Sequence, residues 1–185
     1  YRGKVYVFHG GPSGVTGTAA SPAYSTVGEV ALARLGGSVG AAGDINNDGY
    51  DDVAVCGYSY NQYRGKMWIF HGGPNGLTGT AASPAFSLVG ASSYHWFGAA
   101  VIGVGDVNGD GYDDVASGAF GVNSYRGRVY VFHGGPGGLT GSLNTPAFQV
   151  TGDKVNSMLG WTVSRAGDVN GDGYADLVAG APSYS

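Results

Sequence analysis

The sequence predicts an all-β fold in which four-stranded antiparallel sheets are arranged as the blades of a β-propeller. A 62-residue unit occurs three times without insertion or deletion, each unit contains short runs of β-branched and aromatic residues, and glycine makes up 37 of the 185 residues. Repeats of this length that are made of short strands are typical of propeller blades. The glycines follow no Gly-X-Y period, so they indicate turns and closely packed strands.

Each unit contains four predicted strands. In the first, Lys4 to Phe8, the β-branched and aromatic residues do not alternate with polar ones, as is typical of a strand covered on both faces. The second, Tyr24 to Val27, alternates with polar residues and suits an outer edge. The third, Ser38 to Gly43, is rich in glycine and alanine, which suits the strand nearest the propeller axis, and the fourth begins at Asp52. The only helical candidate is the brief stretch 30–35.

An acidic nine-residue loop joins the third predicted strand to the fourth in every unit. It reads Asp-Ile-Asn-Asn-Asp-Gly-Tyr-Asp-Asp at 44–52 and recurs at 106–114 and 168–176. Oxygen-bearing side chains at loop positions 1, 3, 5 and 9, with a glycine at position 6 for a sharp turn, are what a hard cation such as Ca²⁺ requires. The loops contain 11 of the 13 acidic residues, so the acids serve a local purpose.

The acidic loops have two other interpretations. In one, Asx turns close the hairpins without any metal, and this alternative stays open. In the other, the loops are EF-hands, which is disfavoured because position 12 is Val55, Ser117 or Ala179 instead of a bidentate acid. A predicted strand also follows where an EF-hand needs a helix.

Composition and motifs exclude several classes of function. Because the acids are confined to the loops, neither nucleic-acid nor membrane attraction is indicated, and no run approaches the roughly 18 apolar residues of a membrane span. The single cysteine, Cys56, excludes an intrachain disulfide. The stretch 36–40 matches the nucleophile-elbow pattern of serine hydrolases, but Ser38 lies in a predicted strand where an elbow needs a strand-turn-helix. A hydrolase is therefore a remote alternative, and no catalytic residue is expected.

The order Phe97-Gly98, then the loop 106–114, then Gly180-Ala181-Pro182 in the next unit resembles the FG-GAP repeat of the integrin α-subunit β-propeller and of its bacterial and fungal relatives. The resemblance covers the whole chain, although Leu35 and Leu159 replace the phenylalanine. It implies three Ca²⁺ ions per chain, each held by the side chains at loop positions 1, 3, 5 and 9 and the carbonyl at position 7. The implied ligands are Asp44, Asn46, Asp48, Tyr50 and Asp52; Asp106, Asn108, Asp110, Tyr112 and Asp114; and Asp168, Asn170, Asp172, Tyr174 and Asp176.

The resemblance also implies an extracellular module that acts by binding, as an adhesion or scaffold protein, and not as an enzyme. A glycan-binding lectin is the alternative, because fungal relatives of this fold act as lectins. The most interaction-like cluster is Tyr94, His95 and Trp96, in a link between units where loops carry recognition. Because this cluster is not repeated, it favours a protein partner, while a tryptophan that fills the gap between blades is the competing interpretation.

In the family's blade order the repeats are out of phase with the blades, so residues 1–185 form one propeller unit of two whole blades, 35–89 and 97–151, and two half-blades, 1–28 and 159–185. Each half-blade leaves a bare sheet edge. Joining both edges within one chain gives three blades, below the roughly four to eight that propellers use. We therefore expect a homodimer that closes a six-bladed ring with two-fold symmetry. The alternative is a piece of a longer chain, since the sequence starts at Tyr1 without methionine.

Overall fold

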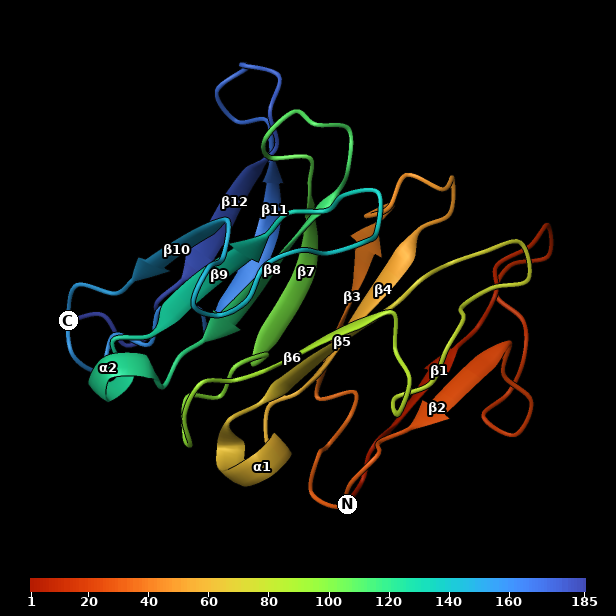
Figure 1. The fold of residues 1–185 in the computed structure, drawn as a ribbon, viewed down its shortest axis with the longest axis horizontal. Coiled ribbons are helices and arrows are strands. Elements are labelled where there is room, and N and C mark those ends of the chain that lie inside the picture. Colours follow the sequence, from red (N-terminus) through yellow and green to blue (C-terminus); the bar gives the residue numbers. More distant parts are fainter.

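The computed structural model describes all of residues 1–185, as twelve strands and two single-turn helices (Figure 1). The elements are β1 (Lys4–Val7), β2 (Tyr24–Val27), β3 (Ser38–Gly43), β4 (Asp52–Gly57), α1 (Tyr60–Tyr63), β5 (Lys66–Phe70), β6 (Phe86–Val89), β7 (Ala100–Gly105), β8 (Asp114–Ala119), α2 (Val122–Tyr125), β9 (Arg128–Phe132), β10 (Phe148–Thr151), β11 (Thr162–Gly167) and β12 (Asp176–Gly180). The all-β prediction is confirmed.

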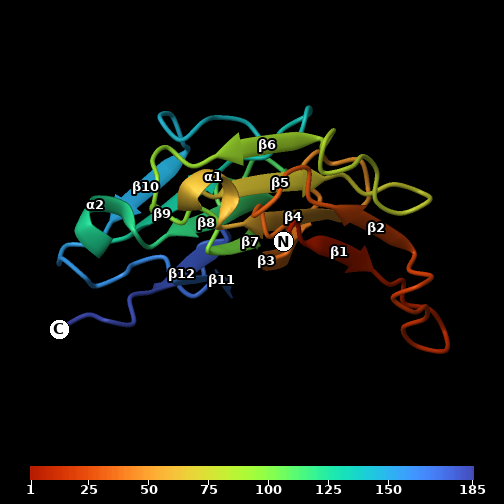
Figure 2. The same ribbon diagram turned by 90° about the horizontal axis from the view of Figure 1, so that it is seen from below.

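The strands form four antiparallel sheets. Two are four-stranded, with the orders β3-β4-β5-β6 and β7-β8-β9-β10, and two are two-stranded, β1-β2 and β11-β12. Figure 2 shows β6 and β10 on the outside of their sheets and β3 and β7 on the inside. Among the glycine-rich strands, β3 contacts β7 and β7 contacts β11. The predicted strand order is therefore confirmed, and the small side chains allow neighbouring sheets to converge.

The hydrophobic core lies between successive sheets, and β5 shows why its sequence has no polar alternate. Met67 and Ile69 on one face of β5 belong to a cluster that includes Phe97 at the start of the next sheet. Trp68 and Phe70 on the other face belong to a cluster that reaches back to β1. All four of these β5 side chains are buried. A strand covered on both faces reads as a continuous apolar run, which is what the sequence shows.

The helical candidate at 30–35 was wrong. Leu32 and Arg34 have φ angles of 65° and 50°, in the left-handed region that a right-handed helix excludes. The end of this segment is instead bound to the residues before β1, because the backbone N–H of Leu35 donates to the carbonyl of Arg2 at 3.1 Å. The single helical turns α1 and α2 lie elsewhere, and each contains central residues with positive φ.

Candidate metal centres and binding surface

The three acidic loops lie together at one end of the sheets, at the top of Figure 1, and α1 and α2 lie at the opposite end. Each loop connects an innermost strand to the next strand of its sheet. The register of the two strands shifts just before the loop, between Ala41 and Gly43 in the first sheet and at the equivalent places in the other two. Gly43 has a φ of 75°, so this bulge suits a residue without a side chain and turns the chain into the loop.

The first aspartate of each loop organises the turn by accepting backbone hydrogen bonds. The two carboxylate oxygens of Asp44 accept from Asp48 N at 3.0 Å and from Gly49 N at 2.8 Å. Asp106 and Asp168 hold their loops in the same way. Burial opposes the ionisation of Asp106, but backbone N–H groups of the loop outweigh it and lower the pKa. The N–H at loop position 6 is the main reason that the pKa of Asp168 is lowered.

Loop positions 3, 5 and 7 are tied together by short-range hydrogen bonds. Asn46 Oδ1 accepts from Asp48 N at 3.1 Å, and Asn46 Nδ2 donates to Asp48 Oδ2 at 3.0 Å. Asp48 Oδ1 accepts from Tyr50 N at 3.0 Å. The other two loops repeat this pattern. The carbonyl of Tyr50 accepts no hydrogen bond within the chain, nor do the carbonyls at position 7 of the other loops.

The aspartate at position 9 anchors its loop to the sheet. The buried Asp52 accepts from Ile45 N at 3.2 Å and from Gly72 N, in the turn after β5, at 2.8 Å. Asp114 makes the equivalent pair of bonds in the second sheet. Burial is the main reason that the pKa of each carboxyl is raised above its usual value. In the third loop Asp176 accepts only from Val169 N, at 2.8 Å.

We expect Asp114→Ala to destabilise the fold far more than Asp113→Ala. Asp114→Ala leaves the N–H groups of Val107 and Gly134 without their acceptor, which costs about 2–4 kcal/mol for two poorly solvated donors. Asp113 accepts one bond, from Asp44 N, so its loss costs about 1 kcal/mol. Urea denaturation in excess chelator measures both variants without any contribution from metal. Equal losses of stability would contradict the anchoring role of Asp114.

Histidines that the sequence analysis did not connect with the loops lie beside them. The ring nitrogen Nδ1 of His71 lies 3.4 Å from Asn46 Nδ2, and that of His133 lies 3.1 Å from Asn108 Nδ2. Each histidine therefore contacts the position-3 amide of the loop in its own sheet. The sequence contains a signal for this contact, because each of these histidines follows the position-3 asparagine of its loop by 25 residues. Likewise, Gly72 and Gly134 each follow the position-9 aspartate of their loop by 20 residues.

The oxygen donors of each loop are of the type that a hard divalent cation prefers. Carboxylates at positions 1, 5 and 9, an amide oxygen at position 3 and a free backbone carbonyl at position 7 occur within nine residues. Besides burial, repulsion from Asp48 raises the pKa of Asp52, and a cation between these two carboxylates would relieve this repulsion. In the folded chain, however, no three acidic, histidine or cysteine side chains meet closely enough to hold a metal ion. Binding would therefore require the carboxylates of a loop to draw together.

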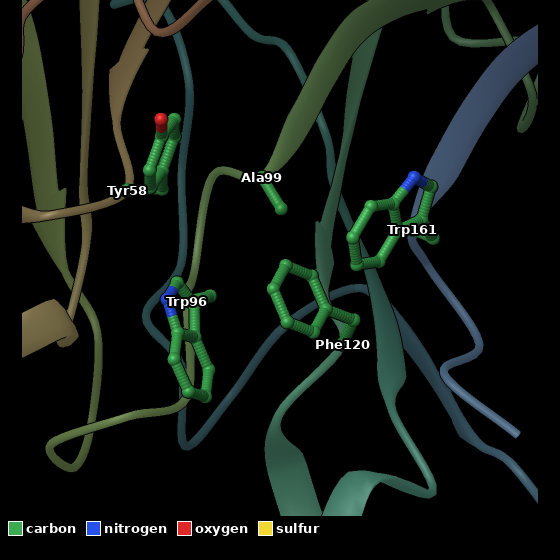
Figure 3. Close-up of a pocket in the computed structure, with 5 residues that line it drawn as sticks. All are labelled: Tyr58, Trp96, Ala99, Phe120 and Trp161. Atoms are coloured by element: carbon green, nitrogen blue, oxygen red, sulfur yellow. The ribbon is translucent and has the colours of Figure 1, made fainter. Parts of the chain in front are cut away.

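At the opposite end of the sheets, six aromatic side chains form a continuous aromatic cluster. Trp96 is at its centre, stacked on Phe120 with ring centroids 5.0 Å apart. Phe120 in turn lies 4.6 Å from Trp161. A pocket of about 310 Å³ opens between these rings, and Figure 3 shows Trp96, Phe120 and Trp161 arranged around it, with Tyr58 on its far side. The aromatic cluster consists of Tyr63, Tyr94, Trp96, Phe120, Tyr125 and Trp161.

The predicted ligand-binding residues fall into two groups. Tyr94 and Trp96 both belong to the aromatic cluster, and Tyr94 is exposed and stacked on Tyr63 with centroids 5.6 Å apart. Both have left-handed backbone angles, with φ of 61° and 51°. His95 is half-buried and is not part of the cluster, and burial, followed by the charge of Arg128, lowers its pKa. The sequence-based prediction did not include Phe120, 24 residues further along the same repeat, or Trp161, which comes from the next repeat.

Ser38, the centre of the nucleophile-elbow match, lies within β3. Its hydroxyl accepts a hydrogen bond from Val101 N on β7 at 3.2 Å, so it links two innermost strands. A nucleophile elbow needs a sharp turn between a strand and a helix, and this position has neither. The local geometry therefore gives no support to a hydrolase centred on Ser38.

Sheets that converge on their innermost strands, each with an acidic hairpin loop at the same end, define the repeats of a β-propeller-type protein. The family model described as the FG-GAP-like repeat matches residues 44–117, and the FG-GAP repeat model matches residues 159–185. The chain belongs to the FG-GAP repeat family of integrin-like proteins. No helix in the structure is both long enough and apolar enough to cross a membrane.

Curated relatives agree with the family models. Integrin alpha-5 of Xenopus laevis is 30% identical over 177 residues, which are 90% of this chain and 16% of that protein. Integrin alpha-IIb of Homo sapiens is 33% identical over 83% of this chain and 15% of its own length. Phosphatidylinositol-glycan-specific phospholipase D of Homo sapiens is 35% identical over 81% of this chain and 19% of its own length. The chain thus spans less than a fifth of each of these three relatives.

Proposed function

We propose that residues 1–185 form a calcium-binding propeller module that acts outside the cell by recognising another protein, in adhesion or as a scaffold, and not by catalysis. The observation that carries the proposal is the threefold repetition of the loop's oxygen donors at one end of the sheets, opposite the aromatic cluster. The integrin relatives support the adhesion role. The extracellular location is supported by the same relatives and by the millimolar calcium that is available outside the cell to fill such sites. The phospholipase D relative does not by itself favour an enzyme, because the chain covers 19% of that protein.

In this proposal the two ends of the module have separate roles. Three Ca²⁺ ions, one per loop, would be held by the side chains at loop positions 1, 3, 5 and 9 and the carbonyl at position 7, and would neutralise the carboxylates concentrated there. The aromatic cluster would contact the partner, because exposed tyrosine and tryptophan on a rigid scaffold contribute most to binding in protein interfaces. Tyr94 and Trp161 are the most exposed members of the cluster and would be its anchors.

A second candidate, glycan binding, is favoured by a neighbouring pocket of about 320 Å³. Its lining combines the rings of Tyr63 and Tyr94 with the polar side chains of Arg34, Asn61 and Gln62. A sugar ring can stack on an aromatic face while its hydroxyls bond to amide and guanidinium groups. Protein recognition remains the main proposal because Trp96, Phe120 and Trp161 of the aromatic cluster line a pocket that contains only aromatic and alanine side chains.

An array of extracellular matrix proteins and glycans, probed with labelled protein in Ca²⁺, tests both candidates. We expect binding to protein spots, lost in chelator and reduced about tenfold to thirtyfold by Tyr94→Ser, as for an interface hot spot. The matched control is Phe148→Ser, because Phe148 is an equally exposed aromatic residue on β10, away from the cluster. Binding confined to glycan spots would establish the second candidate, and binding unchanged by Tyr94→Ser would exclude the aromatic cluster.

A further inference from the structure

The first and second acidic loops, which lie side by side at the top of Figure 1, are joined by a reciprocal pair of hydrogen bonds. The backbone N–H of Asp44 donates to Asp113 Oδ2 at 3.0 Å, and the backbone N–H of Asp113 donates to the carbonyl of Asp44 at 3.2 Å. Asp44 is position 1 of the first loop, and Asp113 is position 8 of the second. Both polar groups of the Asp44 backbone are therefore held by one residue of the neighbouring sheet.

The carboxylate of Asp113 is used for this contact alone. Asp113 is half-buried and accepts no other hydrogen bond, and the one salt bridge of the chain joins Lys66 and Glu29 instead. Its side chain lies against Gly43, where an added Cβ would overlap the carboxylate. Gly43 thus provides the space through which Asp113 reaches the N–H of Asp44.

The residues in and beside this contact belong to both proposed cation sites. Asp113 lies between Tyr112 and Asp114, whose carbonyl and carboxylate are proposed donors of the second loop. Asp44 is a proposed donor of the first loop, and its carboxylate accepts the N–H groups at positions 5 and 6. Since the carboxylates of a loop must draw together to hold a cation, a change in the second loop acts on Asp113 and, through it, on Asp44.

The junction between the second and third loops lacks the side-chain half of this arrangement. Position 8 of the third loop is Ala175, whose backbone N–H donates to the carbonyl of Asp106 at 3.1 Å. Alanine has no side-chain acceptor, and the N–H of Asp106 has no hydrogen-bond acceptor within the chain. The chain therefore contains two equivalent junctions between loops that differ in one carboxylate.

We propose that Asp113 is a positioning residue that couples the first two loops, so that cation binding at either one favours binding at the other. The proposal rests on the proposed calcium role of the loops and deepens it. When the second loop is ordered, Asp113 holds Asp44 in place, so the first loop loses less conformational freedom on binding. By linkage, a filled first loop raises the affinity of the second by the same factor.

The expected size of the coupling follows from the hydrogen bond that differs between the two junctions. The bond from Asp44 N to the Asp113 carboxylate has a charged acceptor and is stronger than a bond between neutral groups. We expect it to couple the first two loops by about fivefold in affinity, at the lower end of the range for coupled sites. The backbone bond that remains between Ala175 and Asp106 should couple the second and third loops by less than about twofold.

Hydrogen exchange in excess chelator tests the contact without calcium. The Asp44 amide should exchange about tenfold faster in Asp113→Ala than in the unmodified chain. Asp113→Asn should restore slow exchange, because an amide oxygen still accepts the bond. The Asp106 amide, which has no acceptor, is the internal reference and should exchange rapidly in all three proteins. Gly135 N donates to Ile45 O in every variant, so the first loop stays attached to the second sheet.

A calcium titration followed by NMR tests the coupling, because the amides of Gly49, Gly111 and Gly173 report on one loop each. Asp110→Ala disables the second loop. It should lower the Ca²⁺ affinity of the first loop about fivefold and that of the third loop less than about twofold. Adding Asp113→Ala should make the first loop insensitive to Asp110→Ala, whereas adding Asp113→Asn should preserve the sensitivity. A residue with only a structural role would not produce this non-additivity.

Three results would overturn the proposal. Equal exchange of the Asp44 amide in Asp113→Ala and in the unmodified chain would show that the contact does not hold the first loop. An equal loss of affinity at the first and third loops, or a loss at the first loop that persists in Asp113→Ala, would show that Asp113 does not carry the coupling. Failure of every loop to bind Ca²⁺ would overturn the proposed function together with the coupling, whereas loops that bind independently would overturn the coupling alone.

Discussion

Removal of calcium is expected to lower the melting temperature of the protein by on the order of 10 °C. At a free concentration about tenfold above Kd, each bound ion stabilises the native state by about 1.4 kcal/mol, so three ions contribute about 4 kcal/mol. This is a large share of the roughly 5–15 kcal/mol that keeps a domain folded, and about 1 kcal/mol shifts the melting temperature by about 2–4 °C in a chain of this size. Calcium should stabilise the acidic loops more than the rest of the chain, because their carboxylates repel one another when no cation lies between them.

Differential scanning calorimetry in Ca²⁺ and in excess chelator measures the shift, and isothermal titration should count three ions per chain. Asp110→Ala removes the position-5 carboxylate of the second loop and should reduce the count by one. Asp153→Ala is the matched control, because Asp153 lies outside the loops and should leave the count unchanged. An identical melting temperature with and without chelator would show that the loops are Asx turns without a metal function.

Gly65→Ala is expected to destabilise the protein by several kcal/mol. Gly65 has a φ of 84°, and a Cβ at this position would overlap the backbone carbonyl of Phe97, where two sheets meet. Alanine therefore incurs the left-handed backbone cost of about 1–2 kcal/mol and must also push apart backbone that cannot move independently. Many molecules should be unfolded at 37 °C.

Gly14→Ala is the matched control for this substitution. Gly14 has a similar φ of 92°, but no atom lies within 4 Å of an added Cβ. Its cost should therefore be limited to the left-handed backbone conformation, about 1–2 kcal/mol. Urea denaturation followed by tryptophan fluorescence gives both values, and the difference between them isolates the close approach of the two sheets. Equal losses would mean that the approach at Gly65 contributes nothing to stability.

The loops and the strands could be predicted from the sequence because each depends on residues close together in the chain. The hydrogen bonds from Asp48 N and Gly49 N to Asp44 form within one turn, so the spacing of acids and glycine specifies the loop. The apolar run of β5 predicts a strand that is covered on both faces, because successive side chains of a strand point to opposite faces. In the structure Met67 and Trp68 are accordingly buried in two different core clusters.

Other features depended on contacts between repeats, which no local pattern contains. The link 30–35 was the only helical candidate in the sequence, but the bond from Leu35 N to Arg2 and the left-handed angles of Leu32 and Arg34 exclude a helix there. Tyr94, His95 and Trp96 were predicted as one binding cluster because they are neighbours in the chain. The fold places Phe120 of the same repeat and Trp161 of the next repeat beside Trp96, while His95 lines neither pocket.

The sequence by itself determined the repeat, the strands and the oxygen-bearing side chains of each acidic loop, because these follow from the residue pattern that the 62-residue units share, and the resemblance to the FG-GAP repeat implied the strand order within each sheet. The tertiary structure alone decided how the units meet. It placed Gly72 N on Asp52, Asp113 on Asp44 N and Phe120 against Trp161. The physical reason is that burial and long-range hydrogen bonds depend on which sheet lies beside which, and that arrangement exists only once the chain has folded.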